Sequence, residues 1–76
     1  MDIHHLVRMA NDIARFYASE PDHEEAVNGV VSHLRRFWDP RMRREIAAHL
    51  ATGGEGLSDL ARAAVGRLDE PGEQAA

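Results

Sequence analysis

Hydrophobic residues recur every three or four positions along most of the chain, the spacing that places them on one face of an α-helix. The pattern predicts four helices, at about residues 2–18, 22–38, 40–51 and 58–68. No stretch alternates in the manner of a strand. We therefore expect an all-α fold, a small bundle of three to four short helices in one domain over residues 1–68. Residues 69–76 offer nothing to pack and are predicted to form a disordered C-terminal tail.

The apolar stripe of each predicted helix should form the core. The first two stripes are Ile3, Leu6, Val7, Ala10, Ile13, Ala14 and Tyr17, then Val27, Val30, Val31, Leu34 and Trp38. The other two are Met42, Ile46 and Leu50, then Leu57, Leu60, Ala61, Ala64, Val65 and Leu68. Trp38 falls on its stripe and is expected in the core, where its indole N–H would need an acceptor. His49 points inward as well and is expected to be hydrogen-bonded.

Polar residues mark the predicted helix ends. Asp22 and Glu25 have the spacing of a variant capping box at the start of the second helix. Asp39 suits the N-cap of the third helix, and Pro40 suits its first position, where a missing N–H has little effect. The glycine-rich segment 53–56 follows a helix and predicts a flexible turn, since a phosphate-binding loop would follow a strand.

Three apolar side chains lie outside the predicted stripes. Met9 and Phe16 are seven residues apart and therefore point in nearly the same direction from the first helix. Phe37 stands well away from the stripe of the second helix. We interpret these residues as a docking face for another protein, because exposed apolar patches usually mark interfaces. The alternatives are a bundle that wraps the first helix on two sides, or scattered surface apolar residues.

Basic residues are concentrated in the middle of a chain whose net charge is −4. All nine are arginine, and five fall within residues 35–44 beside a single acid, which leaves twelve acids and four arginines elsewhere. The five are Arg35, Arg36, Arg41, Arg43 and Arg44. A solvated face with internal pairs such as Arg41–Glu45 would account for one of them. Because arginine pairs bidentately with carboxylate and phosphate, we expect the cluster to bind an anionic group outside the chain.

Other functional classes have less support in the sequence. The chain has no cysteine, and its five histidines lack the spacing that would place two ligands on one helical face, so no metal site is predicted. No catalytic constellation is visible. The chain begins without a signal-like segment and contains no membrane-length apolar run, which favours a cytoplasmic protein. A small nucleic-acid-binding module using residues 35–44 is the alternative, although the acidic remainder would repel a polyanion.

The segment His33-Leu34-Arg35-Arg36-Phe37-Trp38-Asp39-Pro40-Arg41-Met42-Arg43-Arg44 resembles the signature of the delta subunit of NAD-dependent, molybdenum-containing formate dehydrogenases. Residues 3–13, 24–27 and 54–57 also match the family in the expected order. The similarity covers roughly residues 1–68, and its specific part is the Phe-Trp-x-Pro-Arg-Met-Arg core.

The resemblance implies a non-catalytic accessory subunit of a cytoplasmic complex that oxidises formate to CO2 with NAD. In that complex the alpha subunit carries bis-molybdopterin guanine dinucleotide and iron–sulfur clusters, and other subunits pass electrons to NAD through flavin. The delta subunit supports assembly, maturation or stability, and no cofactor is expected in this chain. We expect Met9, Phe16, Phe37 and the five arginines to contact the alpha subunit, or the arginines to bind phosphates of its cofactor. We expect no membrane partner.

Overall fold

A computed structural model describes residues 2–68 of the chain. It contains four helices, α1 (Ile3–Tyr17), α2 (His23–Phe37), α3 (Pro40–Ala51) and α4 (Asp59–Leu68), and no strand within the described range. The predicted all-α bundle and the positions of its helices are confirmed. The tail predicted for residues 69–76 lies outside the described residues.

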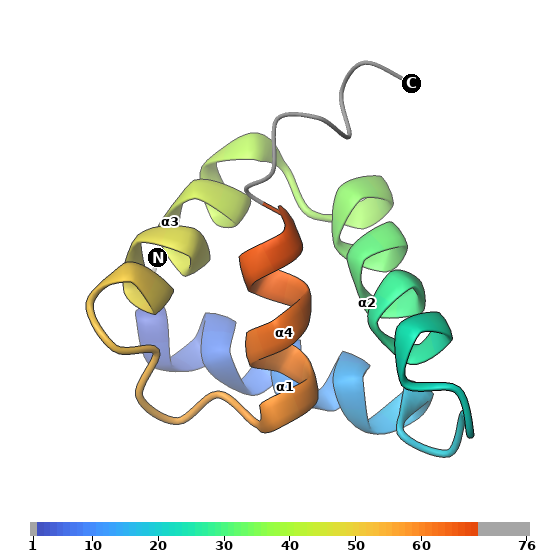
Figure 1. Cartoon of the computed structure of the whole chain (residues 1–76). Helices are drawn as coiled ribbons and strands as arrows, with labels where there is room; N and C mark the ends of the chain where they lie inside the picture. The colour runs from blue at the N-terminus through green and yellow to red at the C-terminus, as the bar shows by residue number, and fades with distance from the viewer. Residues whose placement is uncertain (1, 69–76) are drawn as a thin grey trace.

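Helix α4 occupies the centre of the bundle and contacts all three other helices (Figure 1). Helices α2 and α3 diverge from their junction at Trp38 and Asp39 and lie on either side of α4, while α1 crosses beneath them in this view. Helix α1 packs against α2, α3 and α4, which encloses one core. The opposite side of α1, with the end of α2, is not covered by any of these four helices.

The core consists of the predicted stripes. Every stripe residue is either buried or half-buried and packed against the buried cluster. Trp38 is only 5% exposed, which confirms its place in the core, but no hydrogen bond joins its indole N–H to another residue in the range 2–68. Ala26 is buried as well, although the predicted stripe did not include it.

Aspartates cap the first three helices. Asp39 Oδ1 accepts from the backbone N–H of Met42 at 2.9 Å, with Pro40 in the first turn, as predicted. Asp22 Oδ1 accepts from Glu24 at 3.0 Å, so its role as N-cap is also confirmed. The reciprocal half of the predicted capping box is wrong. The N–H of Asp22 donates to Glu20 Oε2 at 3.2 Å rather than to Glu25, because the preceding turn brings the Glu20 carboxylate to this amide.

The connection between α3 and α4 is fixed by side chains from elsewhere in the fold. Gly54 has a φ of +64°, and its N–H donates to His49 O at 2.9 Å, which ends α3. The guanidinium of Arg62 donates to the carbonyls of Gly53 and Gly54 at 2.9 and 3.0 Å. His49 Nε2 lies 2.8 Å from the carbonyl of Glu55, which confirms that this histidine is hydrogen-bonded.

Two further contacts hold α4 in place. Asn11 of α1 donates to Gly56 O and accepts from Ser58 N, both at 2.9 Å, immediately before α4 begins. At the other end, Arg67 pairs with Glu24 at 2.8 Å and donates to Asn28 at 2.9 Å, which joins α4 to α2. The hydrogen bond from Arg67, together with its positive charge, lowers the pKa of the Glu24 carboxyl.

Candidate protein-docking surface

Two adjoining cavities open on the side of the bundle formed by α1 and the second half of α2. The larger, of about 480 Å³, is lined by Met9, Asp12, Ile13, His33, Phe37, Trp38 and Met42. The smaller, of about 310 Å³, is lined by Asp12, Ile13, Phe16, Tyr17 and His33. Because they share three lining residues, they form one continuous surface, which we call the α1–α2 groove. The structure thus brings together the three residues that lie outside the predicted stripes.

The two phenylalanines of the groove are exposed to solvent. Phe16 is 77% exposed and Phe37 is 67% exposed, and within residues 2–68 no other large hydrophobic residue is exposed. Met9 differs from them because it is half-buried and packs against the core. Met9 therefore belongs to the floor of the groove, while the two phenylalanine rings project beside it.

Neighbouring side chains hold both phenylalanine rings in place. The ring of Phe16 meets Tyr17 edge-on, with centroids 5.1 Å apart and an interplanar angle of 87°. Phe37 lies 4.7 Å from the ring of His33, one turn earlier on α2. The Arg36 guanidinium lies 5.7 Å from the Phe37 centroid, within the range of a cation–π contact. Ordering of this kind lowers the entropy lost when a partner binds.

The five clustered arginines do not form one pocket. Arg36 is exposed at the groove, while Arg35 is half-buried and already interacts within the chain. On α3, Met42 lines the groove but Arg44, two residues later, points about 200° away. The cluster therefore divides between two faces of the α2–α3 junction.

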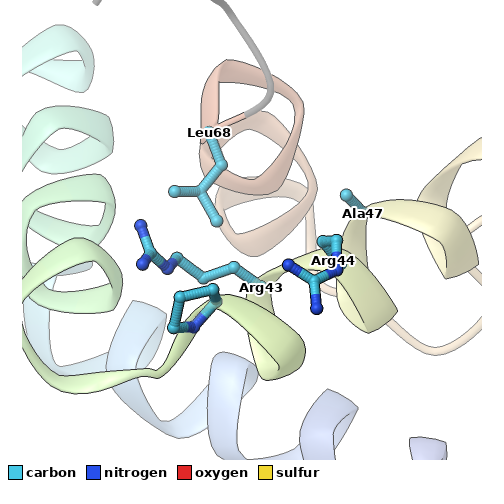
Figure 2. Close-up of a pocket in the computed structure, with 5 residues that line it drawn as sticks. Arg43, Arg44, Ala47 and Leu68 are labelled. Atoms are coloured by element: carbon cyan, nitrogen blue, oxygen red, sulfur yellow. The ribbon is translucent and has the colours of Figure 1, made fainter. Parts of the chain in front are cut away.

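The second face contains a smaller cavity of about 210 Å³, lined by Pro40, Arg43, Arg44, Ala47 and Leu68 (Figure 2). Figure 2 shows the Arg43 side chain running beneath Leu68, whereas the guanidinium of Arg44 points in another direction. Arg43 Nε is buried and has no hydrogen-bond partner in the described part of the chain. Arg43 thus has a packing role that Arg41 and Arg44, both exposed, do not share.

Ion pairing among the described residues leaves Arg36, Arg41 and Arg44 available. Over residues 2–68 the structure shows the pairs Arg15–Asp12, at 3.1 Å, and Arg67–Glu24. Neither involves residues 41–44, and the pair considered between Arg41 and Glu45 is not formed. Among the same residues, no three His, Asp or Glu side chains are grouped so as to hold a metal ion. No helix there combines the length and apolar character needed to cross a membrane.

A family model described as the NADH-dependent formate dehydrogenase delta subunit, FdsD, matches residues 5–65. The chain belongs to the FdsD family. The match confirms, over most of the chain, the resemblance identified from residues 33–44. The matched span also includes every residue that lines the groove. No curated protein and no solved structure matches the chain.

Sequence reasoning missed two polar residues of the groove in this FdsD-family chain. Asp12 and His33 line both cavities, yet neither lies on a predicted apolar stripe. Local signals did exist, because His33 precedes Phe37 by four residues and Asp12 lies between Met9 and Phe16 at helical spacing, so each shares the helical face of its neighbours. The position of Asp12 opposite His33 depends on how α1 packs against α2, which no local pattern determines.

Proposed function

We propose that the protein is a non-catalytic accessory subunit of a cytoplasmic NAD-dependent formate dehydrogenase. It supports the assembly, maturation or stability of the complex by binding the catalytic alpha subunit. Its membership of the FdsD family supports the assignment of the chain to this complex. One observation supports the mode of binding: the exposed Phe16 and Phe37 border an apolar groove beside exposed arginines. Protein interfaces concentrate their binding energy in such aromatic and arginine anchors.

The proposed contacts differ in kind. Met9, Phe16 and Phe37 would bury apolar surface against the partner, which is the favourable contribution expected to dominate. Arg36 and Arg41, both exposed, would pair with acidic groups around the contact and increase its specificity and association rate. The cluster also includes Arg44, which is exposed, and Arg35 and Arg43, which are half-buried and therefore less accessible to a partner.

Co-purification with the alpha subunit tests the role of the cluster. The triple variant Arg36→Glu, Arg41→Glu, Arg44→Glu changes only exposed positions and spares Arg43, whose replacement could disturb folding. We expect it to fold but to recover less alpha subunit and less formate dehydrogenase activity than the wild type. Arg8→Glu, an exposed arginine outside both cavities, is the control and should co-purify normally. An intact, active complex with the triple variant would contradict the proposed role.

Ligand binding by the isolated protein distinguishes the proposal from its alternatives. If the arginines bind a protein surface, calorimetry with guanosine diphosphate should show no binding, and neither should a gel shift with duplex DNA at low salt. Nucleotide binding that is lost in Arg43→Gln and Arg44→Gln would instead support contact with cofactor phosphates. DNA binding that weakens steeply with salt would support the nucleic-acid-binding alternative.

A further inference from the structure

We propose that the α1–α2 groove receives one amphipathic helix of the partner subunit, with acidic residues at the end of that helix beside Phe37. This inference rests on the proposed function and specifies the partner segment by its chemistry. The segment would carry apolar residues at helical spacing for the groove and carboxylates for the arginines at one end.

The form of the groove suits a helix. Its two walls are themselves helices, and Met9 and Phe16 lie two turns, or about 10 Å, apart along α1. The two cavities adjoin at Asp12, Ile13 and His33, so they lie one after the other along the groove. A helix lying along this surface would place one apolar side chain in each cavity, one or two turns apart, as in other helix-in-groove complexes.

The charges around the groove predict how the partner helix is oriented in it. At the Phe37 end, Arg36 lies against the phenylalanine ring, and Arg41 is exposed in the first turn of α3 beside Met42. The carboxylate of Asp12, at the middle of the groove, is already paired with Arg15 at 3.1 Å. At the same end the carboxylate of Asp39 caps α3, so among the described residues two exposed arginines lie beside one acid, and the net positive charge there favours acidic residues in the partner.

Residues 69–76 and a second copy of the chain suit the groove less well than a partner helix. Residues 69–76, Asp-Glu-Pro-Gly-Glu-Gln-Ala-Ala, contain no large apolar side chain that could fill the cavities. In the range 2–68, the exposed large hydrophobic residues are Phe16 and Phe37, and both already belong to the groove. A second copy could offer Phe16 and Phe37 only through the same groove, and it would bring the same arginines with it, whereas the positive charge beside Phe37 favours an acidic segment. We therefore assign the occupant to a different protein.

Site-specific photo-cross-linking tests the inference. p-Benzoylphenylalanine would replace Phe16, Phe37 or, as a control, the exposed Ala48 of α3, in the full chain co-expressed with the other formate dehydrogenase subunits. We expect positions 16 and 37 to cross-link to a single helix of the alpha subunit, at sites one to three turns apart. The site reached from position 37 should adjoin Asp or Glu residues, and position 48 should not reach that helix.

Other outcomes separate this inference from the proposed function. If the complex forms but positions 16 and 37 reach unrelated segments, a second copy of the chain or nothing, the groove inference fails and the accessory role stands. If the unsubstituted chain does not co-purify with formate dehydrogenase, both fail.

A synthetic peptide of the cross-linked helix then tests the predicted direction. Arg36→Glu should raise its Kd about tenfold, whereas Arg44→Glu, at an exposed arginine that points away from the groove, should change it less than about twofold. An equal effect of the two substitutions would contradict the proposed orientation.

Discussion

The side of the bundle that holds α4 differs from the side formed by α1 and the end of α2. On the α4 side, the polar groups of Asn11, Arg62 and Arg67 are engaged by other parts of the chain. On the groove side, two phenylalanines are exposed, and Arg36 rests on one of them. The comparison indicates that different residues carry the stability of the fold and the binding of a partner, so mutation should separate the two properties.

The largest loss of stability should follow truncation of the core. Ile46 is fully buried, and Ile46→Ala should lower the free energy of unfolding by about 2–5 kcal/mol. Phe37→Ala removes a larger side chain from the groove but should change that free energy by no more than about 0.5 kcal/mol. Urea denaturation followed by circular dichroism measures both variants. Similar losses would show that the groove belongs to the core.

Alanine substitution at two glycines, each at a contact between helices, should change the stability in opposite directions. A Cβ at Gly29 would lie 2.6 Å from the Tyr17 ring, so the gain in helix propensity of about 1 kcal/mol should be outweighed by overpacking of about 1–3 kcal/mol. At Gly66 the added Cβ would meet Leu50 at an ordinary 3.6 Å. We therefore expect Gly29→Ala to lower the melting temperature and Gly66→Ala to raise it. Stabilisation by both would show that α1 and α2 pack less closely than described.

A smaller effect is expected at the turn that precedes α4. Asn11→Ala removes two hydrogen bonds and should lower the free energy of unfolding by about 1 kcal/mol, since water can reach both groups left behind. Asn11→Asp keeps the acceptor for Ser58 but turns a carboxylate oxygen toward the Gly56 carbonyl, so that two acceptors face each other. At neutral pH it should therefore lower the melting temperature at least as much as Asn11→Ala. A wild-type melting temperature for Asn11→Ala would contradict the assigned roles.

The smallest effect concerns the ion pair between the half-buried Arg67 and the exposed Glu24. Because Arg67 lowers the pKa of Glu24, the folded state favours the carboxylate, and the resulting stability is present above the unfolded pKa. It is lost as the pH falls through the lower folded pKa. Glu24→Gln should thus reduce the melting temperature only slightly at pH 7, because the Glu24 side chain is 66% exposed, and should make no difference in acid, where Glu24 is protonated in both states. A difference that grows on acidification would contradict this assignment.

Local signals in the sequence determine much of the fold. The helices are bounded by residues such as Asp22, Asp39 and Pro40, whose effects extend only a few positions, so the periodicity and the caps predict four helices in the observed places. Phe16 and Phe37 could be selected because they depart from that periodicity. The helix bounds and the choice of these two phenylalanines both depend on residues no more than two helical turns away in the sequence.

Contacts between distant residues could not be predicted in the same way. Asn11 reaches Ser58 across 47 positions, and Arg67 reaches Glu24 across 43. Helical spacing gives the direction of each arginine on its own helix, but which arginines of α2 and α3 share a face depends on the angle between the two helices. Even the local partner of Asp22 was misassigned, because the path of the preceding turn decides which carboxylate is closer.

The affinity of the purified catalytic subunit for the double variant Phe16→Ala, Phe37→Ala tests the central claim most directly. Both rings are largely exposed in the isolated chain, so the variant should melt at nearly the wild-type temperature. If the groove is the docking surface, its Kd should rise about thirtyfold or more, the effect of losing an interface hot spot of about 2 kcal/mol. A Kd equal to that of the wild type, in a variant that is folded, would contradict the account.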